Sequence, residues 1–130
     1  MFLPKDQWSP RFDATFFSVS IEGYERRSEQ PMVEPPVASS VPAVYYKLVV
    51  YREHQQTIQW RRFSQFVWLH HQLSTIADLP SLPPKTCPWQ PIDDAFLQNR
   101  QSELSDYLVD LLAVPGVATH PSLQIFLQLL

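Results

Sequence analysis

Glycine, cysteine and long hydrophobic runs are scarce in this chain, and each shortage excludes a class of protein. The two glycines, Gly23 and Gly116, lie too far apart to build a glycine-rich phosphate-binding loop. The single cysteine, Cys87, cannot form an internal disulfide, and no stretch approaches the roughly 18 apolar residues of a membrane-spanning helix. We therefore expect a soluble, intracellular domain without a secretory leader.

Basic residues are also in deficit, since 10 lysines and arginines face 13 acidic residues and the net charge is −3. Sequence-independent nucleic-acid binding depends on many cations that neutralise phosphates, so this balance argues against nucleic acid as a partner. It argues equally against membrane binding by bulk charge alone. The 130 residues, 45% of them apolar, are enough for one domain, and any anion site in it must depend on a few well-placed groups.

The first part of the chain has the pattern of a strand followed by a loop. Residues 14–23 read ATFFSVSIEG, in which Phe17, Val19 and Ile21 alternate with polar residues as in a half-buried strand. Residues 25–43 contain four prolines and no periodicity, which predicts a long loop between the first two strands.

Two further strands are predicted at residues 44–52 and 57–63, which are rich in β-branched and aromatic side chains. With the first strand they are expected to form an antiparallel meander. On the last strand Ile58, Trp60 and Arg62 share one face, because side chains alternate along a strand. We therefore expect Arg62 to point with the apolar side chains and Arg61 to point with a glutamine.

The second half of the chain has helical spacing. Ser64 is a candidate N-cap for a first helix, whose inward positions are Phe66, Leu69, His70 and Leu73. A proline-rich segment at residues 77–93 precedes a long helix that Asp93 can cap, with an apolar spine of Leu97, Leu104, Tyr107, Leu108 and Leu111. A last helix from about residue 121 turns Leu123, Phe126 and Leu127 inward. Three strands followed by helices predict an α+β domain, with the sheet packed against a helical subdomain.

Two arginines occupy positions that the periodicity assigns to apolar side chains, Arg62 on the third strand and Arg100 in the spine of the long helix. A buried, unpaired arginine costs several kcal/mol, so each needs a structural partner or an anionic ligand. Lys85 stands in a stiff proline-rich segment, where it is either a solvated charge or a third cation of such a site. Phe63 is either a core residue or a ring on which a sugar-like ligand can stack.

Four motifs, in this order, resemble those of PX (phox-homology) domains. They are RRFSQF at residues 61–66, LPSLPPK at 79–85, FLQNRQSELSDYLVDLL at 96–112 and HPSLQIFLQ at 120–128. The resemblance covers residues 14–130 and leaves residues 1–13 as an N-terminal extension. It implies the PX fold, in which a three-stranded sheet packs against helices and a proline-rich loop.

The resemblance also implies a binding site for a phosphorylated inositol lipid. In the family the arginine at the position of Arg62 holds the 3-phosphate, and the aromatic residue at the position of Phe63, usually a tyrosine, stacks under the inositol ring. Lys85 matches the lysine that contacts the 1-phosphate, and Arg100 matches the arginine that binds the 4- and 5-hydroxyls. The implied ligand is phosphatidylinositol 3-phosphate, and the implied location is cytoplasmic, peripheral on endosomal membranes.

Trp89 and Ile92 follow the lysine in the region that family members insert into the bilayer. Burying the indole ring there would contribute about 2–3 kcal/mol. The alternative is that Trp89 packs back onto the domain. Asp93 and Asp94, which come directly after, are poorly suited to an anionic surface.

Other functions remain open to different degrees. Residues 80–85, PSLPPK, fit a Pro-x-x-Pro-x-Lys ligand for Src-homology-3 domains, which would make the domain a protein-interaction module. An enzyme is not expected, because no nucleophile motif surrounds Cys87 and the adjacent His70 and His71 cannot form a same-face metal pair. No cofactor or metal motif is present. Arg26, Arg27, Lys47 and Arg52 are either solvated charges or an auxiliary surface for anionic lipids.

Overall fold

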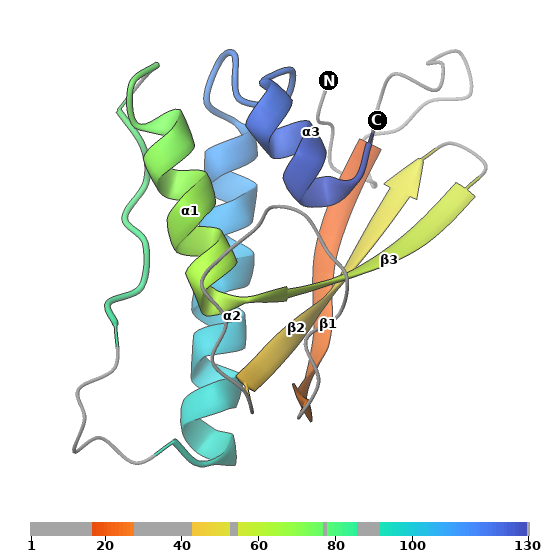
Figure 1. The fold of residues 1–130 in the computed structure, drawn as a ribbon, viewed down its shortest axis with the longest axis vertical. Helices are drawn as coiled ribbons and strands as arrows, with labels where there is room; N and C mark the ends of the chain where they lie inside the picture. Colours follow the sequence, from red (N-terminus) through yellow and green to blue (C-terminus); the bar gives the residue numbers. More distant parts are fainter. Residues whose placement is uncertain (1–16, 28–42, 53–54, 77, 86–91, 130) are drawn as a thin grey trace.

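The computed structural model describes residues 17–27, 43–52, 55–76, 78–85 and 92–129. Within them the chain forms strands β1 (Phe17–Arg27), β2 (Ala43–Arg52) and β3 (Gln55–Arg62), then helices α1 (Phe63–Leu73), α2 (Asp94–Leu112) and α3 (Pro121–Leu127). The sheet is antiparallel in the order β1-β2-β3, and α1 and α2 run alongside it (Figure 1). The predicted α+β meander is confirmed. The expected extension, residues 1–13, and most of the expected loop at 25–43 lie outside the described residues.

One face of the sheet supplies half of the core. Phe17, Val19 and Ile21 are buried as their alternation predicts, and Val19 pairs across the strands with Val50, which is also buried. Directly opposed residues of neighbouring strands share a face, so this pairing places one apolar layer toward the helices. Full burial of each such side chain stabilises the fold by about 1.5–3 kcal/mol.

The helices supply the other half of the core at the spacing that the sequence predicts. Their buried inward residues are Phe66, Leu69 and Leu73 in α1, Leu97, Leu104, Tyr107, Leu108 and Leu111 in α2, and Leu123, Phe126 and Leu127 in α3. The rings of Phe66 and Phe126 meet edge to face, 5.0 Å between centroids, where α1 contacts α3. Asp93 caps α2 as expected, because its carboxylate accepts a hydrogen bond of 2.9 Å from the amide of Phe96.

Strand β1 is longer than the alternation predicts. It continues to Arg27 through an irregularity of the β1–β2 register between Ile21 and Tyr24. Beyond that point Arg26 pairs with Val44. An irregularity of this kind shifts the alternation without ending the ladder, so a strand continues where the sequence predicts a loop.

Helix α1 begins two residues earlier than predicted, with Arg62 and not Ser64 as its N-cap. The amide of Arg62 donates to the side-chain oxygen of Gln65, three residues on, at 2.9 Å. That is the return half of a capping box, which satisfies a backbone donor without a serine at the cap. Phe63 is consequently the first residue of the helix rather than the last of the strand.

The two arginines alternate along β3 as predicted, with Arg62 on the face of Ile58, but that face is not the inward one. Arg61 is fully buried, at 0% exposure, while Ile58 on the opposite face of β3 is 46% exposed. Arg61 pairs across the sheet with Tyr46, a core residue, and therefore shares its face. Arg62 pairs with Tyr45 and points the other way.

Arg61 ties the end of β3 to α3. Its Nε donates to the carbonyl of Phe126 at 2.8 Å and its Nη1 donates to the carbonyl of Trp60 at 2.8 Å. Its Nη2 has no hydrogen-bond partner in the described part of the chain. Burial lowers the pKa of the guanidinium to about 10. Backbone carbonyls thus accept the hydrogen bonds of this buried cation, a role that a carboxylate plays in a buried ion pair.

Replacing Arg61 tests how much these hydrogen bonds and the burial of its side chain stabilise the fold. Arg61→Ala is expected to lower the free energy of unfolding by about 2–4 kcal/mol, because it leaves a cavity and unpaired carbonyls. Arg61→Met keeps the volume and removes a poorly solvated charge, so its loss should be less than half as large. Urea denaturation followed by tryptophan fluorescence measures both, with Lys47→Ala as the charge control. An Arg61→Ala variant as stable as the control would contradict this account.

Candidate functional site

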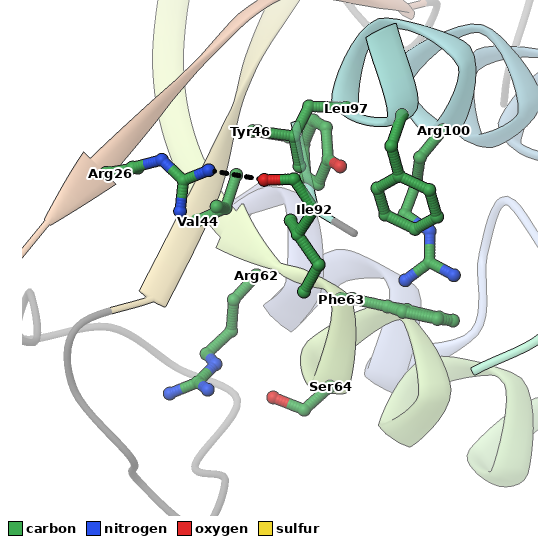
Figure 2. A pocket seen from close by; sticks show the side chains of 10 residues that line it. Arg26, Val44, Tyr46, Arg62, Phe63, Ser64, Ile92, Leu97 and Arg100 are labelled. Atoms are coloured by element: carbon green, nitrogen blue, oxygen red, sulfur yellow. Dashed lines mark hydrogen bonds between the residues drawn. The ribbon is translucent and has the colours of Figure 1, made fainter. Parts of the chain in front are cut away.

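A cavity of about 280 Å³ opens where the ends of β1 and β3 meet the start of α2. Its wall includes Arg26, Arg62, Phe63, Ile92, Phe96 and Arg100, and its remaining lining residues are Val44, Tyr46, Ser64 and Leu97. In Figure 2 these side chains come from the sheet and from both longer helices, with the Arg62 guanidinium on the opposite side from Arg100. The size is near the lower end of the range for small-ligand pockets.

Arg62 reaches the cavity from the junction of β3 and α1. As the N-cap of α1 it has an extended backbone, so its side chain leaves the sheet in the direction opposite to that of Arg61. The side chain is half-buried, and its Cζ lies 6.0 Å from the centroid of the Tyr45 ring. This arrangement places the Arg62 guanidinium beside the Tyr45 ring, at the edge of the cavity.

Arg100 is the most constrained cation of the cavity. Its exposure is only 7%, and its Cζ lies 4.0 Å from the Phe63 ring centroid and 4.9 Å from that of Phe96. Its Nη2 donates to the carbonyl of Pro84. Desolvation lowers the pKa of Arg100, although the group stays cationic at neutral pH. The ring contacts and the carbonyl together offset part of the cost of that burial.

Arg26 is the one cation among the described lining residues that the predicted binding set omits. It stands near the end of β1, and its Nη2 donates to the carbonyl of Ile92 at 2.9 Å, the hydrogen bond drawn in Figure 2. Nearby, the hydroxyl of Tyr24 donates to the Asp94 carboxylate at 3.1 Å, so the end of β1 is fastened to the start of α2. The signal in the sequence was weak, because a charged run after Gly23 is typical of a loop.

The structure brings most of the predicted site residues together and leaves others apart. Arg62, Phe63, Arg100 and Ile92 line the same cavity. Lys85 is exposed and is not among the described lining residues, but it directly follows the proline whose carbonyl accepts from Arg100. Trp89 lies outside the described residues.

The proline-rich segment presents only part of its predicted ligand motif. Of the prolines in the Pro-x-x-Pro pattern, Pro83 is buried and Pro80 is half-buried, and Leu82 packs against the core. A Src-homology-3 domain needs both prolines on one accessible face of the segment. This conformation disfavours that role, which stays an untested prediction.

The charges around the cavity suit an anion. Among the described residues, its lining carries three arginines and no acidic side chain. The described residues contain no group of three or more His, Cys, Asp or Glu side chains placed to hold a metal ion. In the part of the chain that the structure describes, no helix is long and apolar enough to cross a bilayer. The arrangement can bind a small polyanion that presents a flat face to an aromatic ring.

Comparison with known proteins agrees with this geometry. Residues 49–129 match the family model of the PX domain. Sorting nexin-10A of Danio rerio is 36% identical over 72 residues, which are 52% of this chain and 31% of that protein, so the chain spans only about a third of this relative.

Solved structures show the same fold. A designed CISK-PX domain superposes with a TM-score of 0.68 at 27% identity, covering 83% of this chain and 95% of that one. The mouse SNX19 PX domain, solved with a bound sulphate ion, gives a TM-score of 0.61 at 22% identity over 86% of this chain and 95% of that one.

PX domains are lipid-binding modules without enzymatic activity that generally bind phosphoinositides and target proteins to membranes. The family match extends over more than half of the sequence and includes β3, all three helices and most of the residues that line the cavity, whereas Arg26, Val44 and Tyr46 precede it. The chain therefore belongs to the PX domain family.

Proposed function

We propose that the cavity binds the headgroup of phosphatidylinositol 3-phosphate and thereby recruits the protein that contains this domain to endosomal membranes. One observation carries the proposal: Arg62, Phe63 and Arg100 come from different elements of the fold and line a single cavity. A guanidinium can donate two parallel hydrogen bonds to a phosphate, and charge-assisted bonds contribute about 1.5–3 kcal/mol each. The similarity to a protein named as a sorting nexin supports a role in trafficking.

Arg62 is assigned to the 3-phosphate. It is half-buried at the cavity wall, so it combines partial exclusion of water with access for a ligand. Its backbone is fixed by the Gln65 bond that starts α1, which lowers the entropy lost when the side chain binds an anion.

Arg100 is assigned to the hydroxyls at ring positions 4 and 5. Its guanidinium is held between Phe63 and Phe96 and bonded to Pro84, so it cannot move far to make room for another phosphate. One face of Phe63 is covered by this guanidinium, and an inositol ring would stack on the other face. A fixed donor at this wall favours a headgroup with hydroxyls there over one with phosphates.

Lys85 is assigned to the 1-phosphate, which joins the inositol ring to the lipid. The bond between Arg100 and the Pro84 carbonyl holds the residue before Lys85 against α2. Lys85 itself is exposed, as a side chain that contacts the outer end of a headgroup must be. Ile92 is 45% exposed and lines the cavity, so with Trp89 it is assigned to contact with the bilayer beside the bound headgroup.

Arg62→Ala is the first test of the proposed function. Binding to phosphatidylcholine liposomes that contain phosphatidylinositol 3-phosphate should fall about 100-fold or more, because a forked phosphate ligand is lost. The thermal midpoint should change by less than about 2 °C, since a partly exposed side chain outside the core is removed. Lys47→Ala, which removes one positive charge outside the cavity lining, should bind like the parent protein. Retained binding by Arg62→Ala would overturn the assignment.

Selectivity is tested with liposomes that carry each phosphorylated inositide in turn at equal mole fraction. Phosphatidylinositol 3-phosphate should bind about tenfold more tightly than the 4- and 5-phosphates and than the bisphosphates, because Arg100 occupies the space that extra phosphates need. Surface plasmon resonance gives the dissociation constants. Equal affinity for the 3- and 4-phosphates would contradict the role given to Arg62.

Contact with the bilayer is tested by comparing membranes with a soluble headgroup. Trp89→Ala should weaken binding to liposomes about 30- to 150-fold, from the loss of about 2–3 kcal/mol of apolar burial. Its affinity for inositol 1,3-bisphosphate in solution should stay within about twofold of the parent. Ile92→Ala should show the same pattern with a smaller loss. Equal losses in both assays would place the tryptophan in the domain and not in the membrane.

A further inference from the structure

Two side chains near the end of β1 hold the chain where it enters α2. The hydroxyl of Tyr24 donates to the Asp94 carboxylate at 3.1 Å, and Arg26 Nη2 donates to the carbonyl of Ile92 at 2.9 Å. Tyr24 and Arg26 are two positions apart on one strand, so their side chains leave the same face of β1. The two bonds therefore hold the chain on both sides of Asp93, the N-cap of α2.

Tyr24 is a firm support for this contact. Its ring packs edge to face on that of Tyr46, 6.2 Å between centroids, and the two residues pair across the strands. Tyr46 is buried, so the core of the domain fixes the position of the Tyr24 ring. Partial burial and the Asp94 carboxylate raise the pKa of Tyr24, so its hydroxyl remains a donor at neutral pH. Tyr24 is not among the described residues that line the cavity.

Ile92 is an apolar side chain at the rim of the cavity. It lines the cavity and is 45% exposed. In Figure 2 its carbonyl meets the Arg26 guanidinium, and its side chain extends from there toward Phe63. Ordering a segment at the moment of binding costs conformational entropy, and a carbonyl that is fixed in advance reduces that cost.

Asp94 is the group at this rim that opposes contact with a membrane, because an exposed carboxylate is repelled by anionic lipids. The bond from Tyr24 holds this carboxylate against the end of β1. Arg26, two residues further along the same strand, adds a positive charge there. The two contacts thus favour an apolar rather than an acidic approach to the bilayer.

We propose that Tyr24 and Arg26 are positioning residues, which hold Ile92 at the cavity rim in the orientation that meets the bilayer when a headgroup is bound. The inference rests on the proposed function of the cavity and adds the residues that prepare its contact with the membrane. Tyr24 and Arg26 act through Ile92 and not through the phosphate groups.

Tyr24→Phe is the main variant, because it removes the hydroxyl and keeps the ring that packs on Tyr46. Tyr51→Phe is the matched control, since the Tyr51 hydroxyl donates to the exposed carboxylate of Glu22 at 2.5 Å and neither residue is among the described cavity lining. The ligands are phosphatidylcholine liposomes with phosphatidylinositol 3-phosphate and inositol 1,3-bisphosphate in solution. Tyr24→Phe should weaken liposome binding about 3- to 10-fold, the loss of one hydrogen bond, and change binding of the soluble headgroup by less than about twofold. Tyr51→Phe should stay within about twofold in both assays.

A double-mutant cycle tests whether Tyr24 acts through Ile92. Ile92→Ala removes the side chain and keeps the carbonyl that Arg26 binds. In the Ile92→Ala background, Tyr24→Phe should weaken liposome binding by less than about twofold, because the side chain that it positions is gone. A loss as large as in the parent protein would show that Tyr24 acts independently of Ile92, and the proposal would be wrong.

Arg26→Met and Arg26→Lys test the second bond. Methionine keeps an apolar stem and removes every donor, so its loss on liposomes should exceed its loss on the soluble headgroup. Lysine keeps a charged donor at the same place and should recover most of the liposome binding. Equal losses of Arg26→Met in the two assays would make Arg26 a cation of the cavity without a positioning role.

The outcomes separate this inference from the function on which it rests. If Tyr24→Phe binds liposomes as Tyr51→Phe does while Arg62→Ala does not bind, the positioning role is wrong and the proposed function stands. Equal losses of Tyr24→Phe on liposomes and on the soluble headgroup would also overturn that role. If Arg62→Ala binds normally, the proposed function itself has failed. Binding is measured well below the thermal midpoint of each variant, which separates a lost contact from lost stability.

Discussion

The end of strand β3 places one arginine in the core and the next at the cavity, and the site depends on that division. Successive side chains of a strand point to opposite faces, so Arg61 and Arg62 cannot share an environment. Arg61 is buried and donates to the carbonyl of Phe126 in α3, which fixes the strand end against the helices. Helix α1 starts directly after Arg62, so the position of the cavity cation follows from the bonds of its buried neighbour.

Arg100 shows how the fold prepares a cation for a ligand. The Arg100 side chain is already largely shielded from solvent. Its position is set by two aromatic rings and the carbonyl of Pro84. A donor that is fixed in advance loses little conformational freedom when an anion or hydroxyl arrives. The packing of α2 and the geometry of the cavity are therefore linked, because Arg100 is both a buried residue of the helix and a lining residue of the cavity.

The sequence predicts the helical half of this domain better than its sheet. A regular period over many residues identified the spine of α2 and with it the unusual position of Arg100. Strand β3 lies at the edge of the sheet and is largely exposed, so Ile58 does not mark the buried face. The pairing of Gln59 with Leu48 and of Arg61 with Tyr46 marks that face, and strand register cannot be read from one sequence. Arg26 was named only as a solvated charge or an auxiliary lipid contact and not as a cavity residue, since β1 continues past an irregularity into residues of loop-like composition.

The charge of the whole chain and that of the cavity have opposite signs, and the difference bears on how the proposed function would work. The sequence carries a net charge of −3, whereas the described lining of the cavity holds three arginines and no acid. Exposed charges act over about 8–10 Å at physiological salt, so an anionic bilayer would exert little net attraction at a distance. Attraction would arise only when a headgroup enters the cavity, where water is partly excluded. On the proposed function the domain would then respond to the identity of a headgroup rather than to the total amount of anionic lipid.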